Sequence, residues 1–220
     1  MQINNATWLF TKPSDCYHNA ESFWTSVFAM YILSGRAKPI PTYDYVISAG
    51  KWQFKPKRAD FSLEDAPDFF DVVVEGKISH DSFGTDPPIE LQALSPDIVI
   101  KRPGKLVSII EIKTTGRRRL GEYQLSVYMK LFDWLKEIGW KPHLYLLLSA
   151  CHESKPDLEL IRKRKQPEKP QSLSIMLWED VLELMSQSGG DIAAIIDRID
   201  LATHGLAHIL GKVDLEGPLP

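Results

Sequence analysis

Cysteine is scarce in this chain, which has only Cys16 and Cys151 among its 220 residues. Two thiols in unrelated sequence contexts cannot build a disulfide framework or a four-cysteine metal site. Because disulfides are characteristic of oxidising compartments, the low cysteine content favours a reducing, intracellular setting. We therefore expect a cytoplasmic protein whose two cysteines are buried thiols.

Long apolar runs and an excess of positive charge are also missing. Residues 1–5 lack the basic and apolar segments of a signal peptide. The longest apolar runs, such as residues 144–148, are far too short to span a bilayer, so we expect no membrane partner. The formal net charge of −3 is not that of a protein that coats DNA. Contact with nucleic acid would therefore need a local basic patch.

The chain does have the composition of a soluble globular domain, with 44% hydrophobic and 25% charged residues. Its length suits one domain of ordinary size. The order of predicted elements is helix, strands, helix, two strands and helices, which indicates an α/β domain with a mixed central sheet flanked by helices. We expect an N-terminal helix and loop over 1–67, a core over about 68–178 and extra C-terminal helices over 178–212.

Hydrophobic periodicity and turn residues locate the individual elements. The predicted strands cover 71–76 (alternatively the start of a helix), 97–101, 106–113, 143–149 and 172–177. Helices are predicted after Ser14 or Asp15 and over 117–138, 178–186 and 191–210. The stretch 38–67, which is rich in proline and aromatic residues, is interpreted as irregular.

Two charged residues, Glu111 and Lys113, stand at the end of an apolar strand. Side chains alternate along a strand, so these two point to the same face. A strand that is buried on both faces is a poor place for charges, which suggests that they lie at the mouth of a cleft. The alternative is a surface ion pair, and the spacing alone does not decide between them.

The hairpin turn at 102–105 decides whether Asp97 joins this pair. A two-residue loop would put Asp97 on the face away from Glu111. A three-residue loop or a bulge would put all three charged side chains on one face, and Gly104 can supply the left-handed residue for either. Two carboxylates that face each other across strands repel, and a divalent cation between them would remove that repulsion.

The same residues resemble a known signature. Ser95-Pro96-Asp97 and Ile110-Glu111-Ile112-Lys113 resemble the motif of the PD-(D/E)xK nuclease superfamily. Gln124 and Tyr128, further along the chain, resemble the Q-x-x-x-Y motif of its RecB-like branch. The resemblance covers about residues 76–149 and implies a restriction endonuclease-like core.

The resemblance implies a role for each matched residue. Asp97 and Glu111 would hold Mg²⁺ or Mn²⁺, with the carbonyl of Ile112 as a further ligand. Lys113 would act on the water that attacks the phosphodiester. Gln124 and Tyr128, one helical turn apart, would position the lysine and the substrate strand. Alternatively, Tyr128 only packs in the core and Gln124 caps a strand end. Members of this branch with an iron–sulfur cluster need four cysteines, so we expect no such cluster here.

A further ligand is implied by the segment from Gly76 to His80, which resembles the G-x-x-x-H segment of many RecB-like nucleases. There the histidine binds metal, which would favour Mn²⁺ alongside Mg²⁺. The spacing from His80 to Asp97 is short, and a lone histidine near a turn is commonly a surface residue. Glu21, on the first predicted helix, is the alternative additional acid.

Three consecutive arginines, Arg117, Arg118 and Arg119, follow the strand that carries Glu111. They open the next predicted helix, so their side chains and the helix N-terminus can both face phosphate groups. We interpret them as DNA contacts, and a solvated helix start is the alternative.

Together these features predict a divalent-metal-dependent deoxyribonuclease, with an exonuclease or end-processing activity. DNA is the expected partner, with a homo-oligomer or a helicase or recombination partner also compatible. A phage, another mobile element or a repair operon would be a suitable setting. The sequence contains no G-x-x-x-x-G-K-[ST] loop of a helicase motor. Two alternatives stay open: a restriction-type endonuclease on the same fold, and a non-catalytic nucleic-acid-binding module.

Overall fold

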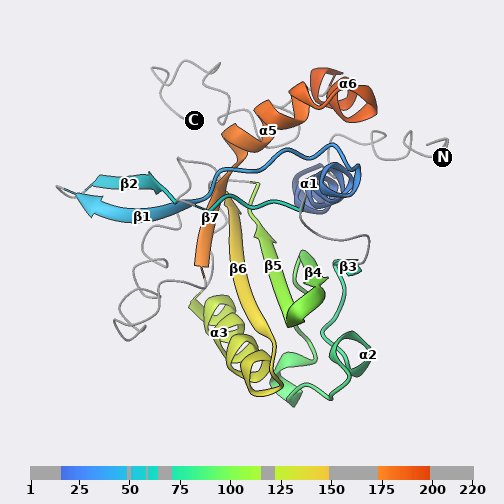
Figure 1. Ribbon diagram of the computed structural model, residues 1–220, viewed down its shortest axis with the longest axis vertical. Coiled ribbons are helices and arrows are strands. Elements are labelled where there is room, and N and C mark those ends of the chain that lie inside the picture. Colours follow the sequence, from blue (N-terminus) through green and yellow to red (C-terminus); the bar gives the residue numbers. More distant parts are fainter. Residues whose placement is uncertain are drawn as a thin grey trace.

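The computed structural model describes residues 16–48, 51–57, 59–63, 71–114, 122–148 and 173–198. Within them, seven strands form one mixed sheet in the order β2-β1-β7-β6-β5-β4-β3, with helices packed against both faces (Figure 1). This arrangement confirms the predicted α/β class.

The elements have the following bounds. The strands are β1 Tyr43–Ser48, β2 Lys51–Pro56, β3 Asp71–Val74, β4 Ile98–Arg102, β5 Leu106–Ile112, β6 Lys141–Leu148 and β7 Leu173–Leu177. The helices are α1 Cys16–Leu33, α2 His80–Phe83, α3 Glu122–Glu137, α5 Trp178–Gln187 and α6 Gly190–Arg198, with short 3₁₀ turns at η3 Ile89–Leu91 and η4 Pro103–Lys105. None of the helices described here has the length and apolar character that crossing a membrane requires.

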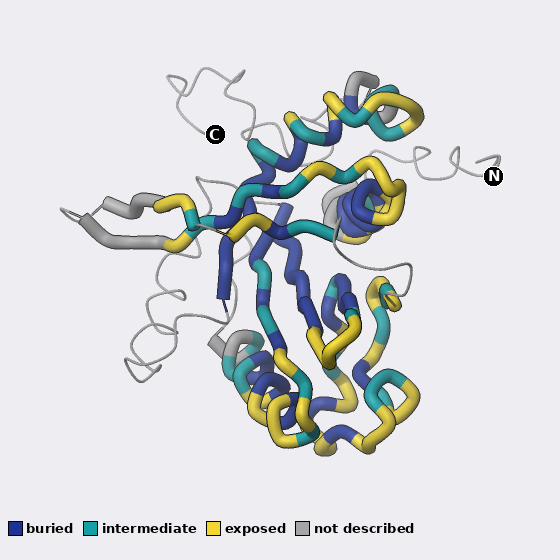
Figure 2. The backbone as a smooth tube through the Cα atoms, viewed as in Figure 1, coloured by how far each residue is buried: buried dark blue, intermediate teal, exposed yellow. Residues whose placement is uncertain are grey.

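Strand β5 lies inside the sheet and is buried over nearly its whole length (Figure 2). It pairs antiparallel with β4 and parallel with β6. Parallel neighbours need a crossover connection, and α3 provides it between β5 and β6. This explains why the sequence from 106 to 148 reads strand, helix, strand.

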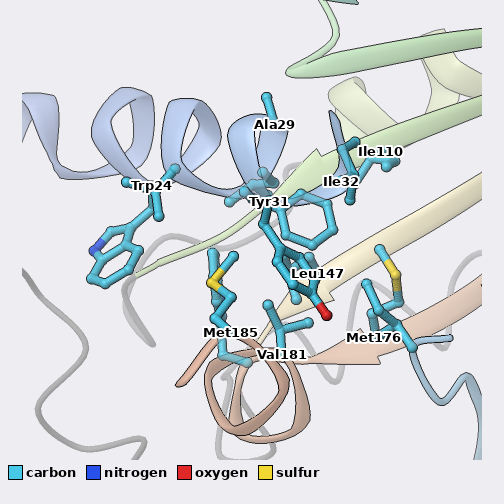
Figure 3. Close-up of a cluster of buried hydrophobic side chains, with 14 of the residues drawn as sticks. Trp24, Ala29, Tyr31, Ile32, Ile110, Leu147, Met176, Val181 and Met185 are labelled. Atoms are coloured by element: carbon cyan, nitrogen blue, oxygen red, sulfur yellow. The ribbon is translucent and has the colours of Figure 1, made fainter. Parts of the chain in front are cut away.

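The two faces of the sheet are covered by different helices. On one face, Ile98 and Ile110 belong to a core that α1 and α5 complete. Figure 3 shows side chains of this core, including Trp24 of α1 and Met185 of α5. On the other face, Val99 and Ile109 pack in a second core with α3. The alternation of apolar residues along β4 and β5 supplies both cores at once.

The stretch 38–67 is not irregular throughout, which corrects the prediction from its sequence. It contains the antiparallel hairpin β1–β2, with Tyr43 opposite Pro56 and Tyr45 opposite Phe54. The flanking prolines suggested irregular chain, but aromatic and polar residues alternate along β2 and at the start of β1, which is the pattern of a strand. Only Tyr43 of β1 pairs with β7, so the hairpin projects from the sheet (Figure 1).

Tyr43 links this hairpin to α5, because its hydroxyl donates a hydrogen bond to Asp180 Oδ2 at 2.8 Å. Burial, followed by the hydrogen bond and the charge of Asp180, raises the pKa of Tyr43 to about 12. The unfolded chain has a tyrosine pKa of about 10. The contribution of this group to stability is therefore complete below about pH 10 and is lost as the pH rises towards about 12.

We expect Tyr43→Phe to lower the free energy of unfolding by about 1 kcal/mol at neutral pH, the usual value of one hydrogen bond. The difference between the wild type and Tyr43→Phe should then shrink between about pH 10 and about pH 12. Urea unfolding of both proteins across this range measures it. If the difference in the free energy of unfolding stays constant with pH, the contact with Asp180 does not raise the pKa of the Tyr43 hydroxyl.

Candidate active site

The β4–β5 hairpin has the register that brings Asp97 to the face of Glu111. Arg102 pairs with Leu106, so the loop consists of three residues, 103–105. Gly104 and Lys105 both have positive φ, at 76° and 58°. Continuing the register by one residue beyond the paired ladder places Asp97 opposite Glu111. A three-residue loop is one of the two arrangements, the other being a bulge, that the sequence predicted for the three charged residues to share a face.

Asp97 lies just before β4 and is fixed on two sides. Its carboxylate Oδ2 accepts a hydrogen bond from the backbone N–H of Ile112 at 2.6 Å, and its own carbonyl accepts one from the N–H of Glu75 at 2.8 Å. A strand residue directs its N–H and C=O to the same neighbour. The carbonyl of Ile112 is therefore at the same edge of β5 as the Asp97 carboxylate.

Glu111 is almost completely buried, with 3% of its side chain exposed. Its carboxylate accepts hydrogen bonds from Lys113 Nζ at 2.6 Å, from Gln124 Nε2 and from the Tyr128 hydroxyl. An ionised carboxylate has about four lone-pair positions, so these donors use most of them. A buried carboxylate without such partners would be strongly destabilising, which makes the three donors a requirement of the fold.

Helix α3 supplies two of these donors. Gln124 and Tyr128 lie one helical turn apart and reach the same carboxylate from above the sheet. Burial, and then the negative charges of Glu111 and Asp97, raise the pKa of Tyr128 well above the ordinary value for tyrosine. The hydroxyl therefore stays protonated and donates to Glu111 at physiological pH. Tyr128 therefore binds the Glu111 carboxylate in addition to packing in the core.

Lys113 follows the last residue of β5, and only 7% of its side chain is exposed. Its backbone N–H donates to the carbonyl of Leu147 in β6 at 2.9 Å. Its carbonyl accepts a hydrogen bond from Trp178 Nε1 at 3.0 Å. The lysine is thus held by a neighbouring strand, by α5 and, through its ammonium group, by Glu111.

The oxygen atoms at this point are of the types that a hard divalent cation binds, although protein donors already use most of the lone-pair positions of Glu111. Two carboxylates and the nearby Ile112 carbonyl are oxygen ligands of the kind that Mg²⁺ and Mn²⁺ take. The cluster contains two carboxyl groups and one amino group. No group of three His, Cys, Asp or Glu side chains able to hold a metal occurs in the described part of the chain. An ion here would therefore complete its coordination with backbone oxygen, water or a phosphate of the substrate.

The structure does not bring His80 to this cluster, which corrects its expected role as a metal ligand. Its Nδ1 is 3.1 Å from Asp86 Oδ1, and both side chains are exposed. His80 begins α2, which is held at the hairpin end of the sheet because Lys101 Nζ donates to the carbonyl of Ser82 at 2.8 Å. Lys101 is four residues beyond Asp97, or ~13 Å along an extended strand. Figure 1 shows α2 at the end opposite to the arrowhead of β5.

Other predicted residues are not placed. Arg117, Arg118 and Arg119 lie in the stretch 115–121, outside the described residues, and the side chain of Glu21 is also not described. Their roles stay predictions. Trp178 was missed from the sequence, because its contact joins residues that are 65 positions apart and a tryptophan at a helix start has no distinctive pattern.

Comparison with protein-family models, with curated proteins and with solved structures gives no match for this chain. The function must therefore be inferred from the residues of the site.

Replacing Lys113 tests how far the buried charges depend on each other. We expect Lys113→Met to lower the free energy of unfolding by about 3–5 kcal/mol, because it leaves Glu111 buried without a counter-charge. Lys101→Met is the matched control: Lys101 pairs with the exposed Asp71, and the expected loss is about 1 kcal/mol. Urea unfolding at neutral pH measures both, and equal losses would contradict the assigned role of the pair. Adding Glu111→Gln to Lys113→Met should restore part of the stability.

The hairpin loop gives a second prediction about this site. A Cβ at Gly104 would meet no atom within 4 Å, so only the positive φ opposes a side chain. We expect Gly104→Ala to destabilise the protein by about 1–2 kcal/mol. Gly104→Asn should cost less, because asparagine tolerates the left-handed region better. Thermal unfolding measures the stability of the two variants. An equal loss of stability in both would mean that the loop adopts another conformation.

Proposed function

We propose that this protein is a divalent-metal-dependent nuclease that hydrolyses phosphodiester bonds in DNA. The observation that supports this most is the gathering of Asp97, Glu111 and Lys113 at the end of β5, where Gln124 and Tyr128 bind the same glutamate. Five residues from three separate parts of the sequence, before β4, at the end of β5 and on α3, thus lie close to the end of β5. Each of them matches a position of the motifs that the sequence resembles.

A simple structural ion pair explains this arrangement less well. A surface pair would be exposed, whereas the side chains of Glu111 and Lys113 are 3% and 7% exposed. Replacing a buried ion pair by apolar residues of similar size is often neutral or stabilising, so stability alone gives little reason to keep one. Buried and coupled charges are common at functional sites, where their chemistry is needed.

The residues have distinct parts in the proposed hydrolysis. A bound Mg²⁺ or Mn²⁺ would lower the pKa of a water molecule and neutralise charge on the phosphate. Asp97, Glu111 and the carbonyl of Ile112 would hold that ion. Lys113 would orient the attacking water and stabilise the negative charge that develops on the phosphate. Gln124 and Tyr128 fix the Glu111 carboxylate, so its orientation is set before substrate arrives.

The proposal includes an exonuclease or end-processing mode, which rests on the resemblance of Gln124 and Tyr128 to the Q-x-x-x-Y motif. Partners such as a second copy of the chain or a helicase are compatible with it. A restriction-type endonuclease would use the same residues but would cut DNA without ends. Closed circular substrates therefore distinguish the two modes.

The direct test is degradation of linear and closed circular DNA, single- and double-stranded, with Mg²⁺ or Mn²⁺. We expect the wild type to degrade linear DNA, and Lys113→Ala to lose at least about a hundredfold in rate. Lys101→Ala should keep its activity, because Lys101 lies at the other end of the hairpin.

A second variant tests whether a loss of activity in Lys113→Ala comes only from misfolding. Asp97→Asn keeps an oxygen that can accept the Ile112 N–H but removes the charge that would bind metal, so it should also be inactive while remaining folded by circular dichroism. No cutting of any substrate by the wild type, or equal cutting by all variants, would overturn the nuclease. DNA binding without cutting would then favour the non-catalytic module.

A further inference from the structure

Trp178 is the first residue of α5 and is fully buried. Its indole makes a hydrogen bond to the backbone next to β5. The Nε1–H group donates to the backbone carbonyl of Lys113 at 3.0 Å. The β5–β6 ladder reaches its end here: Ile112 pairs with Leu147, and β6 stops at Leu148. The indole N–H therefore donates a hydrogen bond to the Lys113 carbonyl at the point where the described strand pairing ends.

We infer that Trp178 is a positioning residue for Lys113, an inference that rests on the proposed nuclease function. It acts through the backbone and touches neither the expected ion nor the expected substrate. The hydrogen bond fixes the peptide group that follows Lys113, and this fixes the direction in which the lysine side chain leaves the chain. On the other side of the same residue, the Lys113 N–H donates to the carbonyl of Leu147.

A lysine at an active site needs such a restraint. Its ammonium group is at the end of a flexible four-carbon stem, so small rotations of the backbone move Nζ by large amounts. Productive geometry must be held within about 0.5 Å. Lys113 comes after the end of β5, where one side of the strand has no further ladder partner in the described pairing. A rigid indole in the core supplies a fixed donor at this point.

The indole is itself held in place by other rings. Trp24 and Phe28 of α1 meet it edge-on, with ring centroids 5.6 and 6.3 Å away. Trp24, Val181 and Met185 belong to the same core (Figure 3). The ring that carries the donor is thus enclosed in the core.

The first test needs no activity. The intact protein, without metal or DNA, is labelled with limiting acetic anhydride, and acetylation of Lys113 relative to Lys101 is read by peptide mass spectrometry. Trp178→Phe keeps most of the ring but removes the N–H. We expect acetylation of Lys113 to be about tenfold faster than in the wild type, because the free energy of one hydrogen bond corresponds to about this factor. Trp24→Phe is the matched control: it shrinks the same core but keeps a ring beside the indole and leaves the N–H of Trp178. Labelling of Lys113 in this variant should therefore stay near the wild-type rate.

The second test uses DNA cleavage. Trp178→Phe should lower kcat by about tenfold with the KM for DNA unchanged, as expected when an interaction that matters only in the transition state is weakened. Trp24→Phe should lose thermal stability with little change in kcat. If Trp178→Phe does not fold, benzothienylalanine at position 178 replaces the N–H by sulfur at nearly constant shape, and the same two readouts apply.

The outcomes separate the two claims. A wild-type protein that cuts no DNA overturns the proposed function, and labelling of Lys113 still decides whether Trp178 positions it. Equal labelling in the Trp178 and Trp24 variants overturns the positioning role, whether or not the protein cuts DNA. A parallel loss of kcat in both variants would likewise reduce Trp178 to a packing residue.

Discussion

The burial of one carboxylate, that of Glu111, is the constraint on which the rest of the site depends. A strand inside a sheet offers this group no water, so its charge has to be met by donors from the protein. One donor, Lys113, comes from the residue that follows the same strand, and two come from α3. The crossover helix between β5 and β6 must therefore place Gln124 and Tyr128 over the end of β5. The hydrogen bonds to Glu111 and the packing of α3 against the sheet therefore depend on each other.

A distant turn controls a second part of the site. Side chains alternate along a strand, so a change of one residue in the hairpin register would move Asp97 to the opposite face. The three-residue loop sets this register at the far end of the two strands, with Gly104 and Lys105 in left-handed conformations. A substitution in the loop can thus alter the carboxylate pair without touching it. The geometry of the acidic residues is determined by backbone conformation as much as by their own contacts.

Local patterns in the sequence predicted β4, β5, α3, β6 and β7 to within a few residues, because apolar periodicity reports directly on burial. They could not choose the loop length, since the Pro103-Gly104 pair fits two registers equally well. The β1–β2 hairpin was hidden by flanking prolines that lie outside or at the edge of its strands. His80 satisfied a spacing rule, but spacing does not say where α2 packs. Trp178 was invisible for a similar reason, because only the fold brings it to Lys113.

Charge balance links the site to its proposed substrate. The site places the carboxyl groups of Asp97 and Glu111 near the single amino group of Lys113, and burial together with the charges of Glu111 and Asp97 raises the pKa of Tyr128. Two carboxylates at this point would repel the phosphate group of a substrate. Under the proposed function, a divalent cation would reverse the local sign, so that the ion and the phosphate would each favour binding of the other. This coupling is reciprocal by thermodynamic necessity. The acidic character of the site is then an advantage, because it would limit strong DNA binding to the metal-loaded protein.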